Sequence, residues 1–127
     1  VAGVETGYGT GGDAARDLYF EIENLVGSNF KDVLHGSSGR NTLMGLDGDD
    51  FLFGYGGTDM LKGGLGNDVI DGGAGSDYAI FSGLRADYTL TKTSANTALV
   101  VGADGTDRLI DVEYFRFDDM DVNIWSL

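Results

Sequence analysis

The chain has 127 residues, of which 21 are acidic and 8 basic, so its formal net charge is −13 at pH 7. Such a charge excludes nucleic acid as a natural partner, because phosphate binding needs a basic surface, and it argues against anionic membranes. Cysteine is absent, which excludes disulfide bonds, and no apolar run approaches the roughly 18 residues of a membrane span, so we predict no transmembrane segment.

Residues 1–26 are predicted to form an N-terminal lead-in and cap. Residues 7–12 satisfy the GxGxxG pattern of dinucleotide-binding loops, but no strand of useful length precedes them, which favours a lead-in loop. The first ten residues lack both a basic region and an apolar stretch, so they do not have the pattern of a signal peptide. Residues 18–26, LYFEIENLV, predict a capping half-coil that covers the open edge of the structure that follows.

Residues 27–80 consist of six consecutive nine-residue units, and this repeat dominates the sequence. The units are GSNFKDVLH, GSSGRNTLM, GLDGDDFLF, GYGGTDMLK, GGLGNDVID and GGAGSDYAI. Each unit begins with glycine, has Asp or Asn at its sixth position and has an apolar residue at its eighth. A disordered acidic linker is the alternative, but a solvated linker has no reason to keep the eighth position apolar throughout. The fixed period therefore predicts a solenoid.

Each unit divides into a turn and a short strand. The first six residues are rich in glycine, which suits a turn with positive φ angles and converging carbonyl oxygens. In the last three residues, strand alternation points the middle side chain inward and its two neighbours outward. Two units then close one flattened coil of an all-β, right-handed parallel β-roll, in which coils stack at about 4.8 Å, the usual strand spacing.

Stacked coils bring each acid beside the acid two units later, and such acids repel each other unless a cation lies between the coils. We predict that Asp50 pairs with Asp68 and Asp59 with Asp77, and these pairs are the most complete candidate sites. Hard oxygen ligands in a flexible loop favour calcium over magnesium, which demands a tighter octahedron. The predicted metal-binding residues are the sixth-position residues and the glycines of the later turns, namely Asp32, Asn41, Gly45, Gly48, Asp50, Gly54, Gly57, Asp59, Gly63, Gly64, Gly66, Asp68, Gly72, Gly73, Gly75 and Asp77.

These units resemble the GGxGxDxUx nonapeptide of the RTX (repeats-in-toxin, haemolysin-type) family. GGLGNDVID and GGAGSDYAI match it in full, whereas the first two units depart most, with Phe30 in place of the inner glycine and Asn41 in place of the acid. The resemblance implies a calcium-binding β-roll module of a secreted bacterial protein. By the same resemblance, the protein leaves the cell unfolded by type I secretion and folds on binding calcium outside, in the medium or at the cell surface.

The nine-residue period is lost from residue 81, and residues 81–127 are predicted to form a β-rich C-terminal cap. Residues 87–92 and 97–102 alternate polar and apolar side chains and are joined by the sequence TSAN, which predicts a β-hairpin. Residues 107–117 mix apolar and charged side chains, and residues 112–115, VEYF, are similar to residues 22–25, IENL, which predicts another strand-like cap there. We interpret Trp125 as an anchor in the core or in this cap.

Large apolar residues at the seventh and ninth positions of the units are expected to face outward and form a patch on each outer face. They are Val33, Phe51 and Phe53 on one face and Met44, Met60, Tyr78 and Ile80 on the other. Exposed patches of this kind need a cover. We expect the flanking segments to pack on them, and a partner surface or a saccharide platform is the alternative.

Catalytic motifs are absent from the sequence. His35 is the only histidine, and neither HExxH nor GxSxG occurs. We therefore expect no catalytic residues and no organic cofactor in this module, although the larger protein that carries it could be an enzyme.

Two other functions stay open. The first is binding of an extracellular polysaccharide. Lys31, Arg40 and Lys62 are the only basic residues in the repeats, too few for a basic groove, so calcium would bridge an acidic glycan. The second is assembly into a surface layer or an adhesin, which the outward apolar faces suggest.

Overall fold

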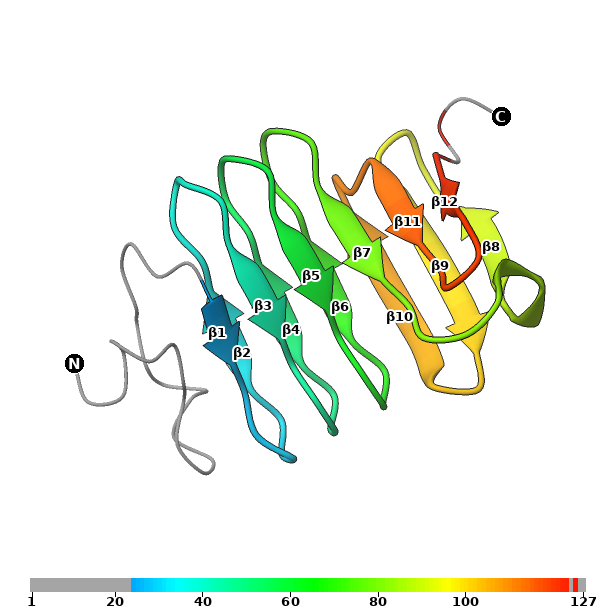
Figure 1. Ribbon diagram of the computed structural model, residues 1–127, viewed down its shortest axis with the longest axis horizontal. Helices are drawn as coiled ribbons and strands as arrows, with labels where there is room; N and C mark the ends of the chain where they lie inside the picture. The colour runs from blue at the N-terminus through cyan, green and yellow to red at the C-terminus, as the bar shows by residue number, and fades with distance from the viewer. Residues whose placement is uncertain (1–23, 124, 126–127) are drawn as a thin grey trace.

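The chain folds as an all-β parallel solenoid with almost no helix (Figure 1), which confirms the predicted fold class. The computed structural model describes residues 24–123 and residue 125. The predicted lead-in and most of the predicted capping half-coil, residues 1–23, lie outside the described residues. The division at residues 26 and 80 into lead-in, repeat and cap stays a prediction. Within the described residues, no helix has the length and apolar character needed to cross a bilayer.

Short strands occupy the last three positions of successive units, as predicted. They are β1 (Asn24–Val26), β2 (Val33–His35), β3 (Thr42–Met44), β4 (Phe51–Phe53), β5 (Met60–Lys62), β6 (Val69–Asp71) and β7 (Tyr78–Ile80). In β2 to β7 the middle residue is buried and its two neighbours are half-buried, which is the alternation expected of a strand with one face in a core.

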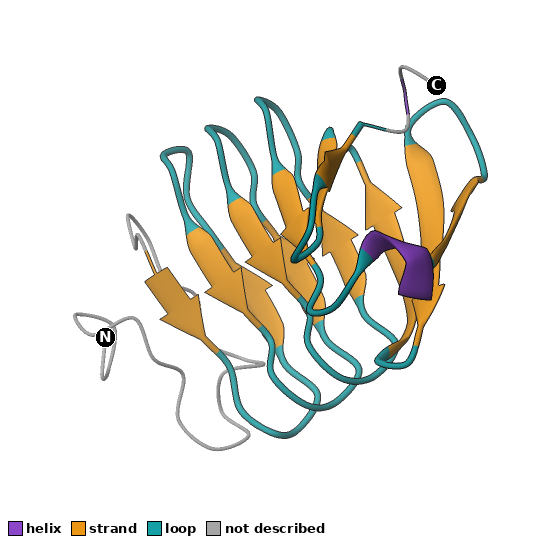
Figure 2. Cartoon of the chain, turned by 45° about the vertical axis from the view of Figure 1, so that its right-hand side comes forward, coloured by secondary structure: helices purple, strands orange, loops and turns teal. Residues whose placement is uncertain are grey.

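Alternate units pair in parallel and form two sheets that face each other. One sheet has the order β1-β3-β5-β7-β11-β12, and the other has the order β2-β4-β6-β10-β9-β8. Within the repeat, partners lie two units apart, as in the pairs Leu34↔Leu52 and Leu52↔Ile70. Figure 2 shows the strands in two layers, with the turns gathered along the two long edges. Between the layers lies one row of side chains per sheet, all 0% exposed: Leu25, Leu34, Leu43, Leu52, Leu61, Ile70 and Ala79.

The C-terminal segment begins with the predicted hairpin. It follows a short 3₁₀ helix, η3 (Arg85–Asp87), and consists of β8 (Thr89–Lys92) and β9 (Thr97–Gly102), which pair antiparallel. The prediction of a single hairpin between residues 87 and 102 is thus confirmed, and it adds two strands to one sheet.

The strand-like cap predicted at residues 112–115 is present, and the segment around it contains one strand more. The segment forms two strands, β10 (Gly105–Ile110) and β11 (Tyr114–Arg116), which belong to different sheets. β10 lies parallel to β6, and β11 lies parallel to β7 and antiparallel to the short strand β12 (Asp121–Val122). The cap therefore continues both sheets.

The outer faces do not receive the expected cover from the C-terminal segment, which extends the sheets at one end of the solenoid (Figure 1). Outward aromatic rings instead stack on their neighbours in the next coil. His35 lies on Phe53 with centroids 5.1 Å apart, and Tyr78 lies on Tyr114 with centroids 4.9 Å apart. Stacking in register removes part of the apolar ring surface from water.

Aromatic side chains close the C-terminal end of the core. The rings of Phe81 and Tyr88 are 5.4 Å apart, and those of Phe81 and Phe117 are also 5.4 Å apart. Trp125 packs against this core, and its Nε1 donates a hydrogen bond of 2.7 Å to the carbonyl oxygen of Val112. The interpretation of Trp125 as an anchor is confirmed.

Candidate metal centre

The sixth-position side chains form two ladders, one along each edge of the solenoid. On the first rim, defined by the turns that end at Asp32, Asp50 and Asp68, the Oδ1 atoms of Asp50 and Asp68 each accept a hydrogen bond of 2.8 Å from the backbone N–H of the acid one coil earlier. On the second rim, defined by the turns that end at Asn41, Asp59 and Asp77, the same bonds measure 2.8 and 2.9 Å. The predicted alignment of sixth-position residues two units apart is confirmed, and their role as metal ligands stays a prediction.

These acids lie inside the turns, with exposures of 1% or less. In the four later turns the second carboxylate oxygen has no hydrogen-bond partner; these atoms are Oδ2 of Asp50, Asp59, Asp68 and Asp77. An unpartnered buried acceptor costs about 1 to 3 kcal/mol, and more when it is charged. No group of the protein binds these four aligned oxygens, so we expect a bound ligand to do so.

The unpartnered oxygens lie against the first glycine of their own unit. A Cβ built on Gly45 would overlap Asp50 Oδ2, and it would lie 2.8 Å from the carbonyl oxygen of Gly63 in the next coil. Gly54, Gly63 and Gly72 stand in the same relation to their own acids. A glycine at the first position thus leaves room for a carboxylate oxygen and a main-chain carbonyl from successive coils to approach one point.

The four later turns also share one backbone form, with positive φ at their second and fourth positions. At the second position φ is 68° for Leu46 and 66° for Tyr55, and at the fourth it is 97° for Gly48 and 105° for Gly66. The other members with positive φ are Gly57, Gly64, Gly73 and Gly75. The predicted turn geometry is confirmed, although two side-chain-bearing residues also adopt it.

The first turn differs, because one of its own residues donates hydrogen bonds to both carboxylate oxygens of its acid. Ser28 donates hydrogen bonds from both its backbone N–H and its hydroxyl to the carboxylate of Asp32, the hydroxyl bonds measuring 3.0 and 3.1 Å. Asp32 therefore has protein partners for both oxygens. Its role as a metal ligand stays a prediction, and its environment is unlike that of the later acids.

In the second turn the sixth residue is an asparagine, and its side chain is itself the hydrogen-bond donor. The amide nitrogen of Asn41 donates to the carbonyl oxygens of Ser37 at 3.1 Å and Gly39 at 2.8 Å, and to Asp59 Oδ1 at 3.2 Å. Three oxygens from two coils thus surround one hydrogen-bond donor. An aspartate at the same position would bring no donor, so a cation would have to supply the positive charge.

We expect Asn41→Asp to lower the free energy of unfolding of the metal-free protein by about 1 to 3 kcal/mol, because it replaces a buried donor with a carboxylate that faces Asp59. Urea denaturation in chelator measures this. Asn96→Asp is the matched control, since the Asn96 amide donates at 3.0 Å to Asp111 on the exposed surface. A loss at Asn41 no larger than at Asn96 would show that the buried amide is not needed.

Burial raises the pKa of the later acids. It raises the pKa of Asp50 and of Asp77 to about 8 and that of Asp68 to about 6, and it also raises the pKa of Asp59. Neighbouring carboxylates add to the shift at Asp50 and Asp77, while the backbone hydrogen bonds oppose it. Raised pKa values mean that the metal-free turns hold negative charge poorly.

The metal-free protein should therefore become less stable as the pH rises from about 4 to about 8. The folded pKa of Asp50, about 8, lies above its ordinary value of 3.8, so the folded state binds more protons than the unfolded state, and stability is lost as the pH rises through the folded pKa. Urea midpoints of metal-stripped protein at pH 5 and pH 8 measure the effect. A midpoint that rises with pH would contradict it.

The donor set fits a hard cation. Within residues 24–123 and residue 125, no three His, Cys, Asp or Glu side chains are grouped so that they could hold a metal ion. A cation in these turns would take carboxylate oxygens from successive coils and main-chain carbonyl oxygens for the rest. An all-oxygen set in a glycine-rich turn favours calcium.

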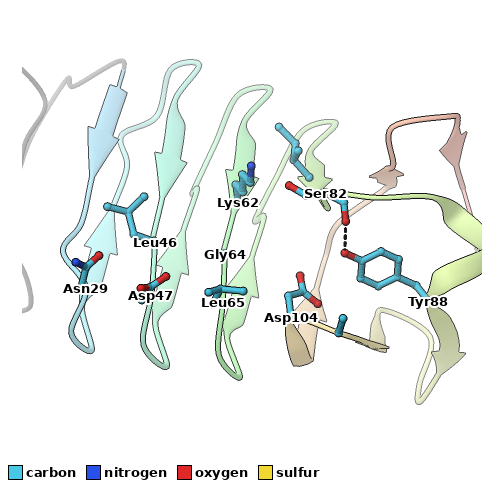
Figure 3. A pocket seen from close by; sticks show the side chains of 11 residues that line it. Asn29, Leu46, Asp47, Lys62, Gly64, Leu65, Ser82, Tyr88 and Asp104 are labelled. Carbon is cyan, nitrogen blue, oxygen red and sulfur yellow. Dashed lines mark hydrogen bonds between the residues drawn. The ribbon is translucent and has the colours of Figure 1, made fainter.

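A groove of about 480 Å³ follows the first rim, and it could not be predicted from the sequence. Its lining includes the third residues of successive turns, Asn29, Asp47 and Leu65, and also Lys62, the last residue of β5 (Figure 3). Ser82, Tyr88 and Asp104 of the C-terminal segment also line it.

Sequence reasoning also missed two acids that continue the ladders. Asp68 donates its backbone N–H to Asp107 Oδ1 at 2.8 Å, and Asp77 donates its backbone N–H to Glu113 Oε1 at 2.9 Å. Both acceptors lie beyond residue 81, where the period is lost.

Comparisons with known proteins bear on the repeat. Residues 26–61 and 53–81 match the RTX calcium-binding nonapeptide repeat, a model of four copies. No curated protein sequence matches the chain. Among solved structures, the chain is similar to the extracellular lipase LipA from Serratia marcescens, with 22% identity and a TM-score of 0.37. The match covers 76% of this chain and 15% of the lipase, so the chain spans a small part of that protein's length.

Proposed function

Residues 26–81 are RTX calcium-binding nonapeptide repeats, and from this premise we propose that the chain is a module of a secreted bacterial protein that folds when calcium binds between its coils. The proposed ligands are the carboxylates of the later turns, in the pairs Asp50 with Asp68 and Asp59 with Asp77, and main-chain carbonyls of the same turns. Calcium would supply positive charge to carboxylates that the protein leaves unpartnered.

The observation that carries this proposal is the row of buried, unpartnered Oδ2 atoms in the four later turns. The first two turns support it by contrast, because there Ser28 and the Asn41 amide supply donors. A glycine-rich chain pays a high entropic cost on ordering, and 22 of the 127 residues are glycine. Binding free energy from calcium would offset that cost, which couples metal binding to folding.

Calorimetric titration of calcium into metal-stripped protein, followed in parallel by circular dichroism, tests the proposal. We expect saturable binding with a gain of β-structure, and a much weaker response to magnesium. Asp59→Asn should reduce the calcium stoichiometry, because it removes one of the unpartnered oxygens. Asp87→Asn makes the same charge change at an exposed site in the cap and should leave the stoichiometry unchanged. An apo protein that is fully folded and binds no calcium would refute the proposal.

The affinity we expect is about 10⁻⁴ to 10⁻³ M, the range of extracellular calcium modules. Such sites would stay empty at cytosolic calcium and fill outside the cell, which agrees with type I secretion of an unfolded chain. Limited proteolysis across this range of calcium gives the test. We expect rapid cleavage at low calcium and protection at high calcium, and protection at every concentration would contradict folding outside the cell.

We propose no catalytic role for the module. His35, its only histidine, lies on an outer face, where its Nδ1 is 2.5 Å from the Tyr55 hydroxyl and its ring stacks on Phe53. An imidazole placed between aromatic rings on an open sheet is not set beside a nucleophile in a pocket. Any enzymatic activity would then belong to other parts of a larger protein.

A second candidate function is binding of a polysaccharide in the groove on the first rim. The groove combines apolar surface from Leu46 and Leu65 with Asp47 and Lys62, a mixture that suits sugar rings and their hydroxyls. Calorimetry with alginate and with a neutral glucan, each with and without calcium, tests it. Heat from alginate only in calcium would indicate a bridging ion, and no heat from either glycan would eliminate this function.

A further inference from the structure

The nine-residue pattern returns once in the C-terminal segment, at residues 102–110, GADGTDRLI. This stretch has glycine at its first and fourth positions, Asp107 at its sixth and Leu109 at its eighth. It most resembles the unit at residues 45–53, GLDGDDFLF, with which it also shares an aspartate at the third position, Asp104. It lies outside residues 26–81, where the repeat is recognised.

The strand of this stretch occupies the place of the next coil. Leu109 is the register partner of Ile70 and is 0% exposed, as are the eighth residues of the earlier units. The backbone N–H of Arg108 donates to the carbonyl oxygen of Asp68 at 2.8 Å, just as that of Val69 donates to Asp50 at 2.8 Å. β10 thus stacks on β6 as β6 stacks on β4.

The turn is also in register. Thr106 N–H donates to Asn67 Oδ1 at 2.8 Å, and Asn67 N–H donates in the same way to Asp49 Oδ1 at 2.7 Å. Gly105 has a φ of 124°, and a Cβ on it would overlap the carbonyl oxygen of Gly66, the relation that Gly66 has to the previous coil. Gly105 therefore takes the place of the fourth residue of a turn, although Ala103 and Asp104 form a two-residue turn between β9 and β10 and Ala103 lacks the positive φ of the earlier second positions.

Figure 3 shows the same succession from the side of the groove. Asn29, Asp47, Leu65 and Asp104 follow one another along the first rim. The first three are third residues of their turns, and Asp104 takes the next place in the row. Tyr88 lies beside it and donates its hydroxyl to the carbonyl oxygen of Ser82.

The repeat is hidden in the sequence because the hairpin interrupts it. Asp68 and its acceptor Asp107 are 39 residues apart, whereas Asp50 and Asp68 are 18 apart. β8 and β9 account for the difference, and β9 pairs antiparallel with β10 at the end of the sheet. The hairpin therefore lies at the end of the sheet, and residues 103 and 104 join β9 to β10.

We propose that residues 102–107 form a further calcium-binding turn, which holds an ion together with the turn at residues 63–68. The proposal rests on the proposed function of the repeat. Asp68 is 1% exposed and its Oδ2 has no partner, Asp107 is 1% exposed and is bound to Asp68 N–H, and Asp104 Oδ1 is buried without a partner. The bond from Asp68 N–H to Asp107 Oδ1 thus repeats the bond from Asp50 N–H to Asp68 Oδ1 one coil earlier, although Gly102 lies against the Tyr88 ring and not against Asp107.

The second rim does not gain a site in this way. There only Asp111, Val112 and Glu113 connect β10 to β11, so the six-residue glycine turn is missing although Glu113 continues the ladder. The added site is therefore specific to the first rim.

Calcium stoichiometry of the full chain tests the inference, measured by calorimetry on the wild type and on Asp107→Asn and Asp104→Asn. An asparagine at position 107 keeps an oxygen that can accept the Asp68 N–H, so the fold is retained, and circular dichroism in calcium checks this. We expect Asp107→Asn to remove one calcium ion per chain, Asp104→Asn to weaken one site at least tenfold, and Asp87→Asn to change nothing.

The outcomes separate the two proposals. If the wild type binds calcium and both variants keep its full stoichiometry and affinities, the added turn is refuted while the proposed function stands. If the wild type binds no calcium, both fail. Loss of a single ion in Asp107→Asn, with the other sites unchanged, supports the added turn.

Discussion

Gly66→Ala should destabilise the protein by about 3 kcal/mol, the sum of a positive φ that alanine tolerates poorly and an overlap with a neighbouring coil. The φ of Gly66 is 105°, and its Cβ would collide with the carbonyl oxygen of Gly48. Main chain cannot move aside as the end of a side chain can. The coils would have to separate at the turn where Asp50 and Asp68 meet.

Gly39→Ala is the matched control, because Gly39 has the same fourth position in the second turn. It has no positive φ, and its Cβ would find nothing closer than Ser37 Oγ at 4.0 Å. Alanine there should be neutral or stabilising by about 0.4 to 1 kcal/mol. Urea denaturation of both variants at saturating calcium gives the comparison. Equal losses of unfolding free energy in the two variants would show that glycine is not needed at position 66 for the contact between coils.

Calcium should raise the free energy of unfolding by about 5 kcal/mol at a free concentration of about 100 times the dissociation constant. Each filled site contributes about 2.7 kcal/mol at this ratio, and the pairs Asp50 with Asp68 and Asp59 with Asp77 provide two. Thermal or urea unfolding across a calcium series measures it, and the free energy should rise with the logarithm of free calcium above the dissociation constant.

The double variant Asp50→Asn and Asp59→Asn is the control for this stabilisation, since it removes one unpartnered carboxylate oxygen from each rim. Most of the dependence on calcium should disappear, and the metal-free form should be no less stable than the wild type, because two buried charges with raised pKa values are gone. If the free energy of unfolding of the double variant depended on calcium as strongly as that of the wild type, the ions would have to bind at other residues.

The solenoid could be predicted from the sequence because each unit carries its own signals. The apolar eighth residue, such as Leu52 or Leu61, specifies the inward face of a strand, and the period of nine specifies that strands two units apart stack. Glycine at the fourth position has a positive φ in the four later units. These are local rules that repeat, so a small error in one unit does not change the prediction.

The details of the candidate site could not be predicted in the same way. Sequence alone places Asp32 and Asp50 in equivalent positions, but only the fold shows that Ser28 satisfies the first and that nothing in the protein satisfies the second Oδ2. Likewise, Asn41 resembles a degenerate ligand in sequence, whereas in the fold its amide is a donor to three oxygens. Partners of this kind depend on rotamers and turn geometry.

The strand β10 of the cap was not predicted, for a different reason. Residues 102–110 keep the repeat pattern, but a search for a fixed period cannot find a unit that a hairpin has displaced from its neighbours. The division of residues 107–117 between two sheets depends on the short connection around Val112, which ends one strand and begins the next. Parallel pairing over long separations leaves no local signal in the sequence.

Diffraction from crystals grown in calcium, recorded at a wavelength where calcium scatters anomalously, would locate any ions between the coils. We predict anomalous peaks between successive coils, one beside Asp50 and Asp68 and another beside Asp59 and Asp77, each within about 2.3 to 2.6 Å of a carboxylate oxygen. A well-ordered solenoid with no anomalous peak at either pair would contradict it.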